Sequence, residues 1–241
     1  MSWQLFFDLD RTLWHHEANC ADVLAEFCSE FPELKHLDPA HVAQRYQVIN
    51  DGLWEIIQEA GYGVDYVRNR RFPFLLQELV PELPTKERRE LAEVLERAFT
   101  QRTPTRGATY PAVAETLRLL KEAGYGVHVL TNGVTSSQER KIAAMGLTEV
   151  VDSVTTSDAS ASYKPDRGIF TYAMRLAGCR PEEAVMIGDS RLRDVGGGKA
   201  AGMRTLWFDA PDALPPDGDS EPDGTFHHFA ELPDALRRIG A

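Results

Sequence analysis

The sequence predicts an α/β protein whose core is a Rossmann-like, doubly wound parallel sheet interrupted by an all-helical insertion. Four short apolar segments lack polar alternation and are typical of parallel strands that helices cover on both faces; they are residues 5–7, 127–130, 184–187 and 205–208. Segments of helical period lie between the later strands, and this strand–helix alternation is typical of a doubly wound sheet.

The stretch between the first two strands is helical in pattern. Helices are predicted at residues 22–31, 39–60, 66–79 and 85–99. Because they separate the first strand from the rest of the sheet, we predict two domains. Residues 1–14 and 106–241 form the α/β core domain, and residues 15–105 form the inserted helical domain.

Proline and glycine mark the ends of the later helices. A helix at 111–123 begins at a proline and ends before Gly124, and a helix at 165–177 begins at a proline and ends before Gly178. Residues 209–224 are rich in Pro, Asp and Gly, which indicates a surface loop before a last helix at 230–239.

The bulk composition narrows the class of protein. A formal net charge of −11 over 241 residues disfavours broad contact with a nucleic acid polymer or an anionic membrane. The chain has no basic leader and no apolar run near the ~18 residues of a spanning helix. Cys20, Cys28 and Cys179 form no Cys-x-x-Cys pair, so neither a disulfide framework nor a zinc site is indicated, and a cytoplasmic location is expected. The composition makes no prediction of oligomeric state.

The most informative segment follows the first strand. Asp8 and Asp10 are two residues apart, so their side chains leave the end of the strand on the same side, and Thr12 follows them. Two unpaired carboxylates would repel each other, whereas a cation between them removes that cost. One carboxylate can then attack a substrate while the other moves protons. The purely structural alternative is a strand end followed by an Asx-type turn.

Polar residues also follow the second and third strands. Thr131 and Asn132 come after the second, Asp189 and Asp194 come after the third, and Lys164 precedes a helix. Alone, each has a structural explanation: a turn, a helix cap or an exposed lysine. Their order at successive strand ends favours one shared site, because open α/β sheets bind ligands at the carboxyl ends of their strands.

In this order the segments resemble the four motifs of the haloacid-dehalogenase-like (HAD) superfamily, whose members are mostly phosphatases. Asp8-x-Asp10-x-Thr12 resembles motif I, and the later motifs are matched by Thr131, Lys164 and Asp189 with Asp194. The resemblance covers the whole chain, since the insertion stands where type C1 helical caps occur.

The resemblance implies a magnesium-dependent phosphatase of small phosphorylated metabolites. Asp8 would be the nucleophile that forms an aspartyl-phosphate, and Asp10 would be the general acid and base. Asp8, the backbone carbonyl of Asp10 and Asp189 would bind Mg²⁺, because a hard cation prefers oxygen ligands.

The remaining motif residues are implied to support this chemistry. Thr131, the Asn132 amide and Lys164 would hold the phosphoryl oxygens, with Lys164 counted among the catalytic groups. Thr12 would fix the loop that presents Asp10, and Asp194 would orient Lys164 or a metal-bound water.

Three alternatives stay open. A 2-haloacid dehalogenase uses the same nucleophile but needs neither the second aspartate nor magnesium, so Asp10, Asp189 and Asp194 favour the phosphatase. A phosphomutase would keep all four motifs. A non-catalytic regulatory module on this fold would have no need for the complete set.

The insertion resembles a subgroup that includes nucleoside 5′-monophosphate phosphatases. The residues that carry this resemblance are Asn50, Leu53, Trp54, Gly61 or Gly63, Arg71 and Phe72. Trp54, Phe72 or Phe74 would then line a substrate pocket, although we expect most of Trp54, Ile57 and Phe72 to form the core of the insertion. The run Arg68, Arg70 and Arg71 could attract an anion, but a solvated helix face is the favoured interpretation.

Overall fold

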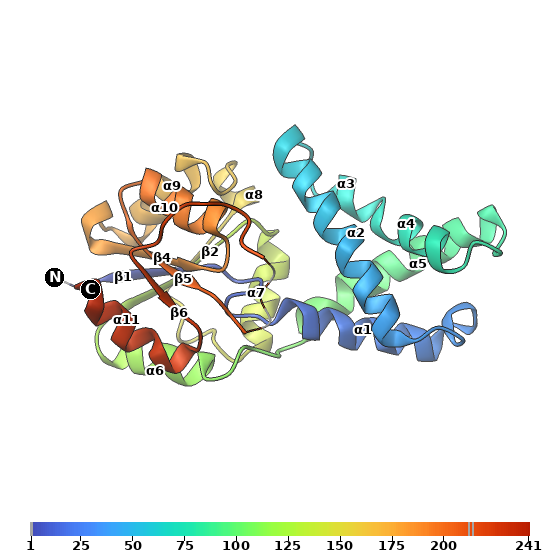
Figure 1. Cartoon of the computed structure of the whole chain (residues 1–241), viewed down its shortest axis with the longest axis horizontal. Helices are drawn as coiled ribbons and strands as arrows, with labels where there is room; N and C mark the ends of the chain where they lie inside the picture. Colours follow the sequence, from blue (N-terminus) through green and yellow to red (C-terminus); the bar gives the residue numbers. More distant parts are fainter. Residues whose placement is uncertain (1, 212, 214) are drawn as a thin grey trace. The chain divides into compact units, whose positions relative to one another are not determined.

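The chain folds as two compact units (Figure 1). The structure is a computed structural model, and it describes residues 2–211, 213 and 215–241. The core unit consists of Met1–His15 and Gly107–Ala241. The helical unit consists of His16–Arg106. The core unit is therefore assembled from two stretches that are distant in sequence.

A parallel sheet forms the centre of the core unit and confirms the predicted Rossmann-like α/β fold. The order of its described strands is β3-β2-β1-β4-β5-β6, so β1 is central and pairs with both β2 and β4. The bounds are β1 Gln4–Phe7, β2 Gly126–Thr131, β3 Ser153–Thr156, β4 Ala184–Gly188, β5 Arg204–Phe208 and β6 Gly224–Phe226. The four predicted strands are all present. The two that the sequence did not indicate, β3 and β6, are the edge strands and are short and partly polar.

Helices cover both faces of this sheet. Figure 1 shows α9 (Arg167–Ala177) and α10 (Gly197–Ala200) on one face, and α6 (Val113–Glu122) and α11 (Leu232–Arg238) on the other. The remaining helical segments of the core unit are α7 (Thr135–Ala144), α8 (Ser157–Ser160), and the short turns at Pro181–Glu183, Arg191–Gly196 and Phe229–Glu231. Burial of Phe6, Met186, Ile169 and Phe170 fixes α9 against the strands.

Glycines end the two predicted core helices as expected. Gly178 follows α9 with φ of 68°, and Gly124 follows α6 with φ of 90°, both in the left-handed region that favours glycine. Within the predicted loop at 209–224, residues 212 and 214 lie outside the described part of the chain. Asp217 anchors another part of this loop, accepting hydrogen bonds from the Ser190 hydroxyl at 2.5 Å and the Leu192 amide at 3.1 Å.

The helical unit consists of five α-helices in its described residues: α1 His16–Glu30, α2 Pro39–Ala60, α3 Asp65–Arg68, α4 Arg71–Leu79 and α5 Thr85–Arg102, with short turns at Pro32–Leu34 and Thr103–Thr105. The single helix predicted at 66–79 is wrong, since the chain breaks between α3 and α4. Pro73 explains the break. In a continuous helix it would lack an amide hydrogen, and its ring would clash with the carbonyl of Asn69.

An aromatic cluster fills the centre of the helical unit. Phe72 is fully buried, and its ring contacts those of Phe27, Tyr46 and Phe99 at centroid distances of 5.5–6.2 Å. Phe72 is therefore a core residue, as the structural interpretation of the insertion expected, and it does not line a pocket.

Arg71 is not on a solvated helix face, so that prediction is wrong for this residue. Its side chain is 11% exposed, and its guanidinium pairs with the Glu96 carboxylate at 2.6 Å and donates to the Tyr46 hydroxyl at 3.1 Å. The guanidinium also lies over the Phe99 ring, 4.7 Å from its centroid. The aromatic cluster thus encloses an ion pair between α4 and α5.

No helix in the described residues is both long and apolar enough to cross a membrane.

We expect Arg71→Met to lower the free energy of unfolding by about 3 kcal/mol, because the buried Glu96 carboxylate loses its partner. The matched control is Arg45→Met. Arg45 also pairs with a glutamate, Glu78, but both side chains are at least 33% exposed, so a loss below about 1 kcal/mol is expected. Urea unfolding of the full chain measures both; equal losses would show that burial of the Arg71 pair is not what matters.

Candidate active site

The carboxyl ends of β1, β2 and β4 bring the sequence-predicted residues together. Asp8 directly follows β1, Thr131 ends β2 and Asp189 directly follows β4. The Asp8 amide donates to the Ile187 carbonyl at 2.9 Å, which continues the pairing of β1 with β4 past the end of β1. Because β1 is between the other two strands, these side chains lie at the centre of one sheet edge.

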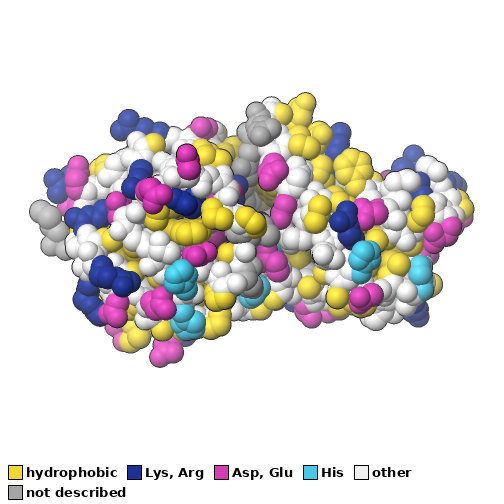
Figure 2. Space-filling model, in the orientation of Figure 1, with side chains coloured by type: hydrophobic (Ala, Val, Ile, Leu, Met, Phe, Trp, Pro, Cys, Tyr) yellow, Lys and Arg dark blue, Asp and Glu magenta, His cyan; other side chains and the backbone are white. Residues whose placement is uncertain are grey.

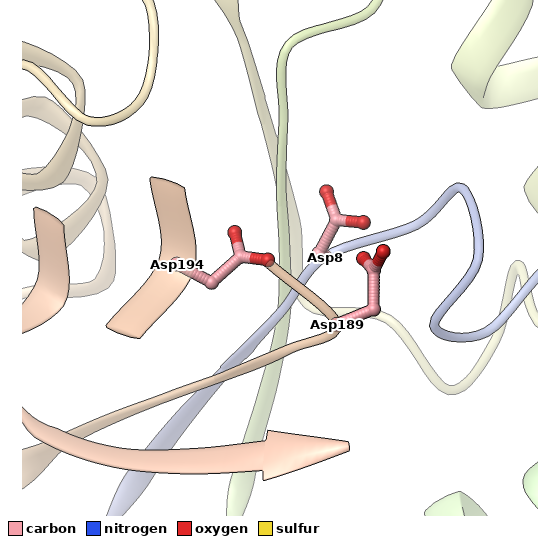
Figure 3. Close-up of side chains that lie close together, drawn as sticks. All are labelled: Asp8, Asp189 and Asp194. Carbon is pink, nitrogen blue, oxygen red and sulfur yellow. The ribbon is translucent and has the colours of Figure 1, made fainter. Parts of the chain in front are cut away.

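Three carboxylates converge there. Asp8, Asp189 and Asp194 each offer an oxygen within 4.8 Å of the others, and Figure 3 shows the three side chains close together. Asp194 comes from the helical turn Arg191–Gly196, where its carboxylate accepts from the Ser190 amide at 3.0 Å. Its approach requires Gly188, because a Cβ at that position would overlap the Asp194 carboxylate.

Burial and the neighbouring carboxylates raise the pKa values of this cluster. Burial, followed by the negative charge of Asp194, raises the pKa of Asp8 to about 6, although Lys164 opposes the shift. Burial and the charges of Asp8 and Asp194 raise the pKa of Asp189 to about 8. The cluster therefore holds more negative charge than its surroundings stabilise.

Lys164 supplies the positive charge closest to the cluster. Its ammonium is buried, contacts the Asp8 carboxylate and pairs with Asp194 at 2.7 Å. Burial alone would lower the pKa of Lys164, but Asp194 and Asp8 outweigh it and raise the pKa. Lys164 is thus a charged ammonium that links β1 to the turn after β4.

Asn132 fixes the backbone of Lys164. Its side-chain oxygen accepts from the Lys164 amide at 2.7 Å, and its side-chain nitrogen donates to the Lys164 carbonyl at 3.0 Å. The following Lys164–Pro165 peptide bond is cis. The motif residues after β2 and before α9 are therefore connected directly.

Thr12 connects Asp8 with Asp189. Its hydroxyl lies 3.4 Å from the Asp8 carboxylate and 3.2 Å from the Asp189 carboxylate, and it accepts from the Asp189 amide at 3.1 Å. The Trp207 indole donates to the Asp189 carbonyl at 2.8 Å on the other side. Both ends of the Asp189 backbone unit are thereby fixed.

Asp10 lies apart from the three clustered carboxylates. It is hydrogen-bonded by two residues that the sequence analysis did not identify. The Lys141 ammonium lies 2.5 Å from one of its oxygens, and the Gln138 amide donates to the other at 2.9 Å. Both partners come from α7, three residues apart, and both are buried although polar. That spacing on one helix face is the signal that could have identified them. Gln138 also donates to the Thr131 hydroxyl at 3.2 Å.

Comparisons with known proteins give one family model and several relatives. A family model described as haloacid dehalogenase-like hydrolase matches residues 5–202. The chain is 32% identical over 204 residues to a glyceraldehyde 3-phosphate phosphatase from Pyrococcus furiosus, covering 85% of this chain and 79% of the relative. It is 28% identical to the pyrimidine 5′-nucleotidase PynA from Streptococcus pneumoniae, covering 96% and 94%.

Among solved structures, the chain is similar to the HAD-hydrolase YfnB from Bacillus subtilis, crystallised with magnesium. The TM-score is 0.80 at 24% identity, with 98% of this chain and 100% of the other covered. At this level of identity the similarity shows the fold.

We expect the metal-free protein to lose stability as the pH rises from about 4 to about 8. The folded-state pKa values of Asp8 and Asp189 are above the ordinary 3.8, so the folded state keeps protons that the unfolded state releases. Asp189→Asn removes the larger shift. In EDTA, its melting temperature relative to wild type should therefore be higher at pH 8.5 than at pH 6. A constant difference at both pH values would contradict the raised pKa of Asp189.

Proposed function

Because this chain belongs to the haloacid dehalogenase-like hydrolases, we propose that it is a phosphatase that hydrolyses small phosphate monoesters with the help of Mg²⁺. One observation carries the proposal. The two aspartates of the first motif have separate surroundings: Asp8 is in the buried carboxylate cluster, and Asp10 is on its own donors from α7. Hydrolysis of a phosphate ester uses both, because one carboxylate attacks phosphorus while the other protonates the leaving oxygen.

The carboxylate cluster fits a hard divalent cation. Its donors are all oxygens, and the pKa of about 8 at Asp189 reflects burial together with repulsion from Asp8 and Asp194, which a bound cation would offset. We propose that Asp8, Asp189 and the backbone carbonyl of Asp10 bind Mg²⁺, and we add Asp194 as a contact to the metal or its water. Bound there, the ion would offset the repulsion between the carboxylates and the phosphoryl group.

In the first step, Asp8 attacks phosphorus. The bond from phosphorus to the leaving oxygen breaks, its electron pair stays on that oxygen, and Asp10 gives the oxygen a proton. The Lys164 ammonium and the Thr131 hydroxyl hold the phosphoryl oxygens. Because the Asn132 side chain is engaged with Lys164, we assign its phosphate contact to its backbone amide.

In the second step, water hydrolyses the aspartyl-phosphate. Asp10, now ionised, takes a proton from the water while the water oxygen bonds to phosphorus. The bond from phosphorus to Asp8 breaks, and Asp8 leaves as a carboxylate. Acid–base assistance of this kind typically contributes about 10²–10⁴ in rate.

Nucleoside 5′-monophosphates are the substrate class that we propose to test first. Support comes from the match to PynA, which extends over nearly all of both chains and so includes the helical unit. We propose that the helical unit is the substrate-selecting cap, since it is inserted directly after the first motif. Phe72 is unavailable for stacking on a base, whereas Phe74 is 49% exposed and Trp54 is half-buried beside Ile57.

The alternatives make different products. A 2-haloacid dehalogenase would release halide and would not need Asp10, whose two donors from α7 favour the phosphatase. A phosphomutase would move phosphate between positions of a sugar without releasing it. A regulatory module would release neither.

We expect Asp8→Asn to abolish phosphate release from a panel of nucleoside monophosphates, sugar phosphates and phosphoglycolate, because the amide is not a nucleophile. The fold should persist, since Lys164 keeps Asp194 as its partner. Released phosphate and far-ultraviolet circular dichroism measure the two effects. Asp234→Asn, which changes an exposed surface carboxylate, is the matched control. Wild-type activity in Asp8→Asn would refute covalent catalysis through Asp8.

EDTA should stop phosphate release, and Mg²⁺ added in excess should restore it, because the carboxylate cluster would otherwise repel the substrate. The same assay with 2-chloropropionate as substrate and halide detection is run beside it. Halide release that persists in EDTA would favour the dehalogenase and contradict the phosphatase.

A further inference from the structure

Asp10 is held by a closed circuit of contacts within the core unit. The backbone turns tightly after Asp10: the Trp14 amide donates to the Leu9 carbonyl at 2.8 Å, and the Arg11 amide donates to the Trp14 carbonyl at 2.9 Å. The turn places the fully buried Trp14 ring below the Lys141 ammonium, which lies 4.1 Å from the ring centroid. The ammonium in turn reaches back to Asp10.

This circuit fixes the Asp10 carboxylate in two places. Lys141 occupies one oxygen and Gln138 the other, so the carboxylate cannot rotate without breaking a hydrogen bond. The Asp10 side chain is still 30% exposed, so substrate or water can reach the carboxylate to exchange a proton. Gly133 in the loop after β2 is part of the arrangement, because a Cβ at this position would overlap the Gln138 side chain.

Burying the Lys141 ammonium costs free energy, and this cost argues for a specific role of Lys141. The Lys141 side chain is only 10% exposed, and a buried ammonium is stabilised here by one carboxylate and one aromatic face. The Asp10 side chain is 30% exposed, so water could solvate this carboxylate without Lys141. The lysine is therefore not needed to satisfy Asp10, but it does determine where the Asp10 oxygens lie.

We propose that Lys141, supported on Trp14 and assisted by Gln138, is the positioning residue that aims Asp10 at the leaving oxygen of the substrate. The inference rests on the proposed phosphatase function, and it concerns only the step in which Asp10 transfers a proton. We assign the phosphoryl oxygens to Lys164 and Thr131, whereas Lys141 pairs with Asp10. Loss of Lys141 should therefore affect substrates in proportion to their need for a proton on the leaving oxygen.

The test compares two leaving groups. An alkyl phosphate expels an alkoxide that must be protonated, whereas 2,4-dinitrophenyl phosphate expels a phenolate that is stable without a proton. The quantity measured is kcat/KM, since it reports only the steps up to formation of the aspartyl-phosphate and excludes the later attack of water. The alkyl phosphate used is the one that wild type hydrolyses fastest in the panel above.

In Lys141→Met, kcat/KM for the alkyl phosphate should fall about 10–100-fold, which is the size expected for a misplaced catalytic group. For the dinitrophenyl ester it should change by less than about threefold, because that leaving group gains little from acid catalysis. Lys141→Arg keeps the charge and should recover most of the loss with the alkyl phosphate. If circular dichroism shows that Lys141→Met is misfolded, Lys141→Gln takes its place in the same comparison.

Lys121→Met is the matched control. Lys121 also pairs with an aspartate, Asp152, but this pair is at the amino end of β2, on the opposite edge of the sheet from Asp10. Its kcat/KM for both substrates should stay at the wild-type value.

The outcomes are distinct. An equal loss for both substrates in Lys141→Met, or no loss for either, would overturn the positioning role while leaving the phosphatase intact. A wild type that hydrolyses neither ester would overturn the proposed function itself, and the inference with it.

Discussion

The imbalance between buried charges at the carboxyl ends of β1 and β4 is the constraint on which the site depends. Three carboxylates converge there, and the ammonium closest to them is that of Lys164. Because the site is buried, each uncompensated charge is costly. The pKa values of Asp8 and Asp189 are raised as a result, which favours their protonated forms. The same imbalance is what a divalent cation would relieve. Protons and a cation would therefore compete for the same carboxylates. Gly188, Asn132 and Thr12 hold these carboxylates and Lys164 close together.

The two aspartates of the first motif show how two residues of one type acquire different properties. Asp8 continues the strand pairing and faces the cluster, whereas Asp10 belongs to the turn that carries Trp14 and faces α7. Asp8 lies beside two other carboxylates and the Lys164 ammonium, whereas Asp10 is paired with two donors from α7. A separation of two residues in sequence is enough, because the chain leaves the sheet between them.

The central strands and the proximity of the motif residues could be predicted, because apolar runs ending in polar residues are local features of the sequence. The edge strands β3 and β6 were missed, since Ser153–Thr156 and Gly224–Phe226 are short and carry polar residues or glycine. The roles of Lys141 and Arg71 are not local. Each is an ordinary surface-type residue in sequence, and each becomes buried only when its helix meets a carboxylate that is distant in the chain. Pro73, by contrast, was a local signal for the break between α3 and α4.

The central position of β1 has a consequence for how the protein is made on the ribosome. The strand that carries Asp8 is synthesised first, but its neighbours β2 and β4 follow only after residues 126 and 184. The nascent β1 therefore stays unpaired while the whole helical unit is translated. The helical unit can fold during that time. Assembly of the carboxylate cluster is completed by Asp189 and Asp194, so a chain that is truncated before β4 contains Asp8 without the other two carboxylates. The carboxylate cluster can thus form only after both stretches of the core unit have been translated as far as Asp194.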